Sequence, residues 1–550
     1  MGASVIVKDL HITAGDQTLV DHLSFVIEPG EVLALIGESG SGKTTTALAL
    51  MGYARHGCAI TGGSVRIGDT DVLGLSPAGQ RALRGRTVSY IAQSAAASFN
   101  PSRTIMDQVV EPARIHGTMP RAKAEAEAKA VQLFRELALP NPETIGQRYP
   151  HQVSGGQLQR LMAAMALITD PDLVILDEPT TALDVTTQIE VLRAFRRVVR
   201  ERRATAVYVS HDLAVVAQMA DHILVLRGGQ MQEVNSTAQI LAKPAHEYTQ
   251  SLLAAARPAP RATGHCKGEG ELLLEVRELS AGYGPVDSKG QPATLILEDI
   301  NFKLYRGQAI GVIGESGSGK TTLARAVAGL IAPSKGNMLF KGHALQPDLR
   351  QRSKEDLRQI QIVFQMADTA LNPSQTIERI LARPLQFYKG MQGPALQRRI
   401  HELLDLVRLP HSVAQRLPGG LSGGQKQRVN LARALAAEPD LILCDEVTSA
   451  LDTVVGAAVL DLMADLRREL GVSYLFISHD LHTVRAVCDE IIVMQHGRKL
   501  DHVVRADFDR GPHHPYYELL AASVPELRQG WLEERDLQVT RAVAPVALAA

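Results

Sequence analysis

The sequence repeats itself over most of its length, and this repetition limits the fold more than any other feature. The words GESGSGKTT, SGGQ and SHDL each occur twice, in the same order. In both copies, 23 residues separate the serine of SGGQ from an Asp-Glu pair, and 33 separate that glutamate from the histidine of SHDL. A unit of about 250 residues is too long for a solenoid repeat and is a domain in its own right.

The boundaries between the copies follow from local composition. Residues 257–271 (RPAPRATGHCKGEGE) combine proline, glycine and charge without apolar periodicity, which predicts a surface linker. We therefore expect one domain over residues 1–256 and a second over 272–525. The tail, 526–550, ends in TRAVAPVALAA, and we expect it to fray without an obvious role.

Composition excludes several classes of protein. Of the 550 residues, 45% are hydrophobic and 21% are charged, which is typical of globular proteins. The net charge is −1, so no overall field attracts nucleic acid or an anionic membrane. The four cysteines form no CxxC pair, which argues against a zinc knuckle or a disulfide framework. We find no secretory signal and no apolar run of about 18 residues, so attachment to a membrane would need another chain.

Short apolar runs predict a parallel sheet with helices between its strands, which is an α/β fold. In each half one run enters a glycine-rich loop, one ends in acid and one ends at Ser-His-Asp, and runs of this kind suit strands buried on both faces. Residues 120–138, rich in Ala, Glu, Lys and Leu, predict a helix. The runs are 31–36, 173–176 and 206–209 in the first half and 308–313, 441–444 and 474–477 in the second.

Each glycine-rich loop fits the pattern GxxxxGK[ST], which predicts a phosphate-binding loop. The glycines let backbone N–H groups point at phosphate oxygens, the lysine holds the β- and γ-phosphates, and the threonine ligates Mg²⁺. An ordinary glycine turn is excluded by the full motif, its strand and helix, and its second copy. The predicted residues are Gly37, Ser39, Gly40, Gly42, Lys43, Thr44 and Thr45, and Gly314, Ser316, Gly317, Gly319, Lys320, Thr321 and Thr322.

The acidic pairs Asp177-Glu178 and Asp445-Glu446 end strands that should lie beside these loops. The aspartate is placed to hold Mg²⁺, and the glutamate to polarise the attacking water. A strand-end acid that caps the next helix is the alternative, and a neighbouring phosphate loop argues against it.

Three further motifs have both a functional and a purely structural interpretation. SGGQ precedes a helical pattern, and one copy alone would favour a simple capped helix, but two copies, each 23 residues before an acid pair, point to an anion site. A glutamine after an apolar run can order a metal's water, and a strand-end histidine can bond the γ-phosphate, but both residue types are common without such roles. These residues are Ser154, Gly155, Gly156, Gln157, Ser422, Gly423, Gly424 and Gln425, with Gln93, Gln365, His211 and His479.

The order of these motifs resembles that of the ATP-binding subunits of ABC transporters, over nearly the whole chain. The resemblance implies a RecA-like core, an antiparallel β subdomain and a helical subdomain in each half. It matches Gln93 and Gln365 to the Q-loop as Mg²⁺ ligands, His211 and His479 to the switch histidine, and Asp184 and Asp452 to the D-loop. It also implies two composite ATP sites, one pairing Lys43 with Ser422 and the other pairing Lys320 with Ser154.

Four short segments of the sequence resemble segments of the oligopeptide, dipeptide and nickel uptake ATPases. They are SFNP at 98–101, ALNP at 370–373, and the segments HEYTQSLLAAARP (246–258) and HPYYELLAASVPEL (514–527). The resemblance implies peripheral attachment to the cytoplasmic face of the inner membrane. Its partners would be two permease chains and an extracytoplasmic binding protein for a peptide or peptide-like molecule, with no nucleic acid. Members of this group often carry a cluster of cysteines in the C-terminal extension. This chain has only Cys266 near the corresponding place, so we expect no iron–sulfur cluster.

The halves depart from the family pattern in different ways. Tyr283 matches the adenine-stacking aromatic, whereas the first half has Ala14 there, which predicts weaker stacking unless Phe25 or His11 substitutes. Val153 and Val447 are milder changes that remove no catalytic group. We therefore expect two hydrolytic sites of unequal affinity.

Two other functions remain open from sequence. A soluble tandem ABC protein acting on ribosomes or DNA would typically carry a long charged insert or a zinc element, which this chain lacks. The motor of an exporter could look similar to this chain, although the HPYY-type ends favour uptake.

Overall fold

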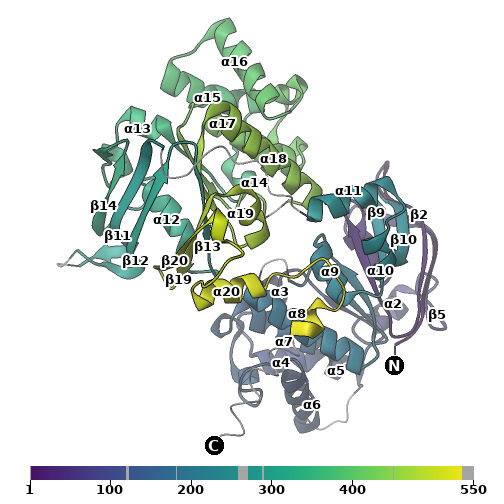
Figure 1. Ribbon diagram of the computed structural model, residues 1–550. Coiled ribbons are helices and arrows are strands. Elements are labelled where there is room, and N and C mark those ends of the chain that lie inside the picture. Colours follow the sequence, from purple (N-terminus) through teal and green to yellow (C-terminus); the bar gives the residue numbers. More distant parts are fainter. Residues whose placement is uncertain are drawn as a thin grey trace, which may run out of the picture. The chain divides into compact units, whose positions relative to one another are not determined.

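The computed structural model describes residues 2–118, 123–180, 183–257, 270–287, 290–449 and 451–535. They form two compact units, each with its own core (Figure 1). Unit 1 contains the described residues of 2–257 and 525–535, and unit 2 contains those of 270–524. Among the described residues, none of the helices combines the length and apolar character needed to cross a bilayer.

The main sheet of unit 1 has six strands in the order β10-β9-β3-β8-β7-β6. All neighbours pair in parallel except β9 and β10. Every residue of β3, β7 and β8 is buried, which is why these strands read as unbroken apolar runs. The bounds are β3 Val32–Gly37, β6 Val88–Ile91, β7 Leu173–Asp177, β8 Thr205–Val209, β9 His222–Arg227 and β10 Gln230–Ser236.

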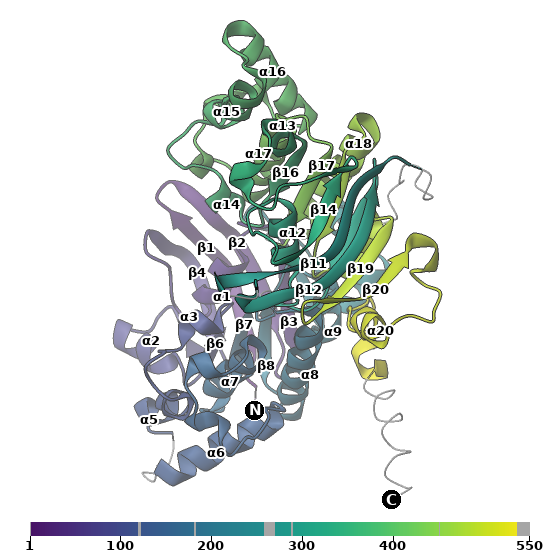
Figure 2. The ribbon, with the colours of Figure 1, turned by 90° about the vertical axis from the view of Figure 1, so that its left-hand side faces the viewer.

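A second, antiparallel sheet in the order β2-β1-β4-β5 packs on the main sheet of unit 1 (Figure 2). Val5 and Val7 of β1 share a buried cluster with Leu33 and Leu35 of β3. The two sheets thus enclose one core, as expected when an antiparallel sheet buries one face. The bounds are β1 Val5–Ala14, β2 Gln17–Ile27, β4 Cys58–Ile67 and β5 Thr70–Asp71.

The helices of unit 1 include a helical subdomain between β6 and β7. The helix predicted over 120–138 is α6, within the described residues. The helices are α1 Lys43–Ala49, α2 Pro77–Leu83, α3 Ala95–Ser98, α4 Ile105–Val109, α5 Glu111–His116, α6 Lys123–Glu136, α7 Gly155–Leu167, α8 Val185–Glu201, α9 Leu213–Met219, α10 Thr237–Ala242 and α11 Glu247–Ala256, with 3₁₀ turns at Ile145–Gln147 and Pro150–Gln152.

Unit 2 repeats this architecture, which confirms the predicted tandem α/β fold. Its main sheet has the order β16-β17-β18-β13-β19-β20, and its antiparallel sheet the order β12-β11-β14-β15. The strands are β11 Leu272–Val286, β12 Pro292–Tyr305, β13 Ala309–Ile313, β14 Lys335–Phe340, β15 His343–Ala344, β16 Ile360–Val363, β17 Leu441–Asp445, β18 Ser473–Ile477, β19 Glu490–Gln495 and β20 Arg498–Val504. The helices are α12 Lys320–Val327, α13 Lys354–Gln359, α14 Ala367–Ala370, α15 Ile377–Lys389, α16 Gly393–Leu406, α17 Gly423–Leu435, α18 Thr453–Leu470, α19 Leu481–Val487 and α20 Pro515–Ala522, with 3₁₀ turns at Leu349–Gln351, His411–Gln415, Pro418–Gly420 and Arg505–Asp507.

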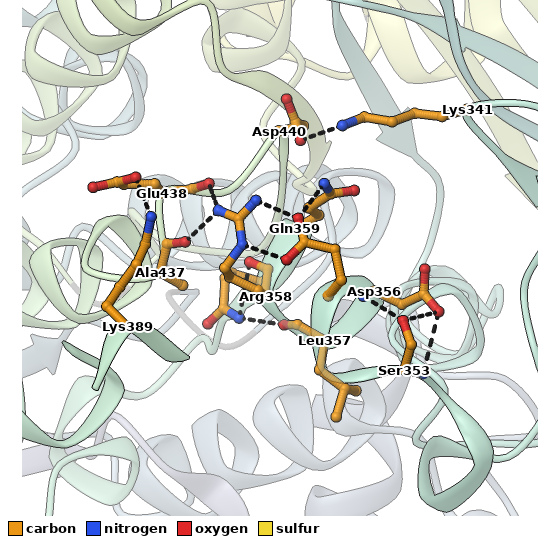
Figure 3. A network of polar contacts seen from close by, with 12 residues as sticks. Lys341, Ser353, Asp356, Leu357, Arg358, Gln359, Lys389, Ala437, Glu438 and Asp440 are labelled. Carbon is orange, nitrogen blue, oxygen red and sulfur yellow. Dashed lines mark hydrogen bonds and ion pairs between the residues drawn. The ribbon is translucent and has the colours of Figure 1, made fainter. Parts of the chain in front are cut away.

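Arg358, in α13, ties the helical subdomain of unit 2 to the rest of that unit (Figure 3). Its guanidinium donates to the carbonyls of Ala437 (2.9 Å) and Glu438 (2.8 Å), just beyond α17, and to Glu355 (2.8 Å). Lys389 of α15 donates to the Glu438 carboxylate at 2.5 Å. Backbone carbonyls after a helix end need such partners, so this network fixes the position of the helix that follows SGGQ.

The tail expectation is wrong for the part of 526–550 that the structure describes. Residues 525–535 return to unit 1, and Trp531 is only 1% exposed. The buried Gln218 side chain accepts from the Leu532 N–H (3.1 Å). Burial of apolar side chains and this bonding stabilise a segment whose sequence suggested fraying. Residues 536–550, and 258–269 of the predicted linker, lie outside the described residues, as does Cys266.

Candidate functional site

Each phosphate loop joins a buried strand to a helix, as the motif predicts. In unit 1 the loop follows β3 and ends where α1 begins at Lys43. A Cβ at Gly37 would lie 2.1 Å from the carbonyl oxygen of Leu226, and one at Gly314 would lie 2.1 Å from that of Met494. Only glycine fits these positions, so the neighbouring strand sets the curl of the loop.

The two loop lysines are buried within their own loops. Lys43 Nζ donates to the carbonyls of Gly37 (2.7 Å) and Glu38 (2.8 Å). Lys320 makes the same two bonds in unit 2, at 2.7 and 2.8 Å. Both ammonium groups are therefore held inside the loop, beside the backbone that cradles phosphates in this motif.

The strand-end aspartates meet the loop threonines. Thr44 Oγ1 donates to Asp177 Oδ1 at 3.0 Å, and Thr321 Oγ1 donates to Asp445 Oδ1 at 3.0 Å. A hydroxyl and a carboxylate are hard oxygen donors of the kind that Mg²⁺ prefers. The chemistry of this donor set therefore fits a Mg²⁺–nucleotide site in each unit.

Tyr90 is a residue of this site that the sequence did not predict. Its hydroxyl donates to Asp177 Oδ2 at 2.6 Å from the neighbouring strand β6. Burial raises the pKa of Asp177, while the hydrogen bonds from Tyr90 and Thr44 lower it, with a net increase. Ile362 takes the place of Tyr90 in unit 2, so only the first site has this second donor.

Three motifs that are distant in sequence converge on the glutamate of unit 1. Glu178 has a φ of +47°, in the left-handed region that favours glycine. Other residues adopt this strained backbone conformation mainly at functional sites. Gln93 Nε2 donates to its Oε2 at 2.9 Å, and His211 Nδ1 lies 3.1 Å from its Oε1. Burial lowers the pKa of His211, but the hydrogen bond and charge of Glu178 raise it overall.

Unit 2 builds the same triad around Glu446, whose φ is +49°. Gln365 Nε2 donates to Glu446 Oε2 at 2.6 Å, and His479 Nδ1 lies 3.3 Å from Oε1. The hydrogen bond with Glu446 raises the pKa of His479. The repetition indicates that both glutamates are held in one orientation by an amide and an imidazole.

SGGQ forms a capped helix start in both units. Ser154 Oγ accepts from the Gln157 N–H (3.3 Å), and the Gln157 side chain accepts from the Ser154 N–H (3.1 Å). Ser422 and Gln425 form the same reciprocal cap on α17. SGGQ thus caps a helix in both units, the anion-site interpretation stays a prediction, and the serine remains exposed at the helix start in each unit.

The second glycine of SGGQ has a packing role that the sequence did not reveal. A Cβ at Gly156 would lie 2.1 Å from Thr187 Cγ2 of α8, and one at Gly424 would lie 2.2 Å from Val455 Cγ1 of α18. The preceding Gly155 meets nothing closer than 3.7 Å. The second glycine thus lets the helix that follows SGGQ pack closely against the next long helix, α7 against α8 and α17 against α18. This packing role is separate from the exposure of backbone N–H donors.

The predicted D-loop aspartates also cap helices. Asp184 accepts from the Thr187 N–H at 3.0 Å at the start of α8, and Asp452 accepts from the Val455 N–H at 3.0 Å at the start of α18. These bonds fix the junction between each acid pair and the helix after it.

The adenine-stacking position differs between the units. Tyr283 is 42% exposed, and its hydroxyl lies 3.4 Å from Thr322 Oγ1 in the first turn of α12. In unit 1, Ala14 pairs with Gln17 at the end of a shorter hairpin. Phe25 cannot replace the tyrosine, because it is 7% exposed and belongs to the core. His11 faces Asp21, with Nδ1 at 3.5 Å from Oδ1.

The end of each half contributes a tyrosine that sequence reasoning did not assign to the site. Tyr248 OH accepts from the Glu38 N–H at 3.2 Å, and Tyr516 OH accepts from the Glu315 N–H at 3.0 Å. His246 and His514 cap the two helices, accepting from the N–H of the tyrosines at 3.1 and 3.2 Å. The His-x-Tyr sequence, which is repeated at the end of both halves, is the sequence signal that could have pointed to these tyrosines.

Comparison with known proteins agrees with this geometry. Residues 20–181 and 297–449 match the ABC transporter family, and residues 503–545 match the oligopeptide/dipeptide transporter C-terminal region. The chain is similar to the glutathione import ATP-binding protein GsiA of Salmonella choleraesuis and to that of Escherichia coli K12. Each is 36% identical, over 92% of this chain and 86% of the relative.

Among solved structures, cbiO1 from Clostridium perfringens, part of the ABC transporter complex cbiONQ, is 27% identical. It covers 43% of this chain and 90% of its own, with a TM-score of 0.38. The family matches in both halves and the length of the GsiA matches decide the assignment. The chain therefore belongs to the ABC transporter family, as a tandem ATP-hydrolysing transport subunit that carries the oligopeptide/dipeptide transporter C-terminal region.

Proposed function

We propose that this ATPase drives uptake of a small peptide or peptide-like molecule, with glutathione as the first candidate. The observation that carries the proposal is the similarity to glutathione import proteins over 92% of the chain. The C-terminal region of the oligopeptide/dipeptide transporters supports the same class of substrate. Both units also carry complete sets of phosphate-loop, acid-pair and signature residues.

Each ATP is sandwiched, in this proposal, between the phosphate loop of one unit and the SGGQ segment of the other. One site pairs Lys43 with Ser422, and the other pairs Lys320 with Ser154. The exposed serine at each helix start supports the idea, because helix N-termini attract phosphate. Closure on ATP and opening after hydrolysis then provide a rigid-body movement for the transporter.

The residues of each site have distinct roles in hydrolysis. Glu178 and Glu446 polarise the attacking water, held in place by Gln93 and His211 in unit 1 and by their counterparts in unit 2. Mg²⁺, when bound, would neutralise part of the negative charge of the phosphates. Its proposed ligands are Thr44, Asp177 and Gln93 in unit 1 and Thr321, Asp445 and Gln365 in unit 2.

The proposed partners are two permease chains and an extracytoplasmic substrate-binding protein. The chain would attach to the permeases at the cytoplasmic face of the inner membrane. Among the described residues, no helix is suited to crossing a bilayer.

Uptake by the whole transporter tests the proposal. The chain is reconstituted with its permeases and its substrate-binding protein in vesicles, and uptake of labelled glutathione is compared with that of a dipeptide, a longer peptide and Ni²⁺. We expect ATP-dependent glutathione uptake that the Glu178→Gln/Glu446→Gln double variant abolishes. Uptake of none of the peptide ligands, or extrusion instead of uptake, would overturn the assignment.

A further inference from the structure

A bulge in the first hairpin of unit 1 brings two histidines and an aspartate together. His11 lies on β1, and Asp21 and His22 lie on β2, where the pairing register shifts between Leu10 and Ile12. His22 has a φ of +49°, so its backbone is in the left-handed region. Asp9 on the partner strand also has a positive φ, +54°, so both strands depart from regular geometry beside these side chains.

One carboxylate oxygen faces both imidazole rings. Asp21 Oδ1 lies 3.5 Å from His11 Nδ1 and 3.8 Å from His22 Nε2. The three possible ligand atoms all lie within 4.8 Å of one another. The two rings lie 5.1 Å apart with their planes tilted by 33°.

Two further side chains orient these groups from outside. Asp9 Oδ1 lies 2.6 Å from His22 Nδ1, which leaves the Nε2 lone pair directed at Asp21. Gln230 Nε2 donates to Asp21 Oδ2 at 2.8 Å and so leaves Oδ1 for the histidines. A carboxylate behind a ligating histidine, and a bond to the second carboxylate oxygen, are the usual supports of a metal site in proteins.

The His11 ring carries a polar atom that the hairpin leaves without a hydrogen bond. Its Nδ1 is buried and has no hydrogen-bond partner within the part of the chain that the structure describes, although Asp21 Oδ1 lies 3.5 Å away. A buried polar atom of this kind requires an explanation. A metal ion between His11, Asp21 and His22 provides one.

We propose that His11 Nδ1, Asp21 Oδ1 and His22 Nε2 bind a divalent transition-metal ion of the zinc class. Two imidazoles and one carboxylate suit Zn²⁺ and its borderline neighbours, and water completes the coordination. Tetrahedral ligands on bonds of about 2.0–2.1 Å stand roughly 3.3 Å apart. The spacing from Asp21 to His11 is already close to this, and the His22 side chain, 65% exposed, has room to move inward.

Unit 2 provides an internal comparison. Leu10 and Leu23 pair in unit 1 as Leu279 and Ile300 pair in unit 2. The matched positions there hold Ser280, Glu298 and Asp299, without a histidine. These matched positions in unit 2 therefore do not form the proposed site.

The site connects to the phosphate loop of unit 1 through backbone hydrogen bonds. The Asp21 N–H donates to the Gly229 carbonyl (2.9 Å), and the Gly229 N–H donates to the Ser41 carbonyl (3.2 Å). An ion bound to this hairpin stabilises the strand that supports the loop. We therefore expect Zn²⁺ to raise the thermal stability of the nucleotide-free protein.

Zn²⁺ binding to the full chain, free of nucleotide and Mg²⁺, tests the proposal by calorimetry and by the melting temperature. Wild type should bind one more Zn²⁺ than the His11→Ala/His22→Ala variant, while His151→Ala, at an exposed histidine of the same unit, should match wild type. Asp9→Asn should weaken the site 10- to 100-fold. The exposed His22→Gln variant provides the same comparison should the double variant fold poorly. Equal Zn²⁺ stoichiometry and affinity in wild type, in the His11→Ala/His22→Ala variant and in the His22→Gln variant would overturn the proposal.

Discussion

The hydroxyl of Tyr248 accepts a hydrogen bond from the backbone N–H of Glu38, across 210 residues of sequence. Tyr516 and Glu315 repeat the contact in unit 2, across 201 residues. Each phosphate loop is thus braced by the helix that closes its own half. This contact gives the His-x-Tyr word of the C-terminal regions a physical role at the nucleotide site.

Removal of that hydroxyl should weaken nucleotide binding. We expect Tyr248→Phe and Tyr516→Phe each to cost about 0.5–1.5 kcal/mol, the usual contribution of one hydrogen bond, or roughly 2- to 10-fold in ATP affinity at that site. Fluorescent-ATP titration of variants with the other loop lysine changed to alanine reports each site alone. Tyr53→Phe, at an exposed tyrosine, is the control. Unchanged affinity in both test variants would show that the brace is not needed.

Tyr90 should set the pH dependence of the first site. Its hydrogen bond lowers the pKa of Asp177, which burial raises, so Tyr90→Phe should raise that pKa further. Since Mg²⁺ needs the ionised carboxylate, Mg-ATP binding should be lost at a higher pH as the solution is acidified. A pH series in a Lys320→Ala background isolates this site, and identical profiles with and without Tyr90 would contradict the prediction.

The His211–Glu178 pair should stabilise unit 1 more at low pH. The pKa of His211 is raised in the folded protein, so its contribution is complete below its unfolded value near 6.5 and disappears as pH rises through the folded value. His211→Gln should therefore destabilise by roughly 0.5–1.5 kcal/mol near pH 6 and by less near pH 9. Melting curves at both pH values measure this, with exposed His151→Gln as the control. A loss that grows with pH would reverse the predicted sign.

Gly156 should tolerate alanine far less than Gly155. The added methyl would lie 2.1 Å from Thr187 Cγ2 at position 156 but 3.7 Å from its nearest neighbour at 155. We expect Gly156→Ala to cost about 1–3 kcal/mol by overpacking, and Gly155→Ala to cost little. Adding Thr187→Ser, which removes the obstructing methyl, should restore stability. Equal melting temperatures for the two alanine variants would refute the packing role.

The sequence predicted the main parts of the site because its motifs are local and occur twice. The strand, loop and helix around Lys43 follow from motif order in a parallel sheet, whereas the contacts of Gln93 and His211 with Glu178 were not predicted and emerge only from the structure. Tyr90 could not be predicted, because it lies within an apolar run and unit 2 has isoleucine in its place. Residues 525–535 act through contacts with a distant segment, which no local pattern encodes, and the repeated His-x-Tyr word marks Tyr248 without showing which loop it contacts. The distance from Gly156 to Thr187 likewise depends on packing between helices.

One glutamate in each unit activates, in our proposal, the water that attacks ATP. This role is tested by steady-state ATP hydrolysis, with bound nucleotide counted after gel filtration, in the Glu178→Gln/Glu446→Gln variant and in the control Glu201→Gln. We predict that the double variant hydrolyses almost no ATP and retains two ATP molecules per chain, while the control behaves as wild type. Undiminished hydrolysis in the double variant would show that neither glutamate activates the water.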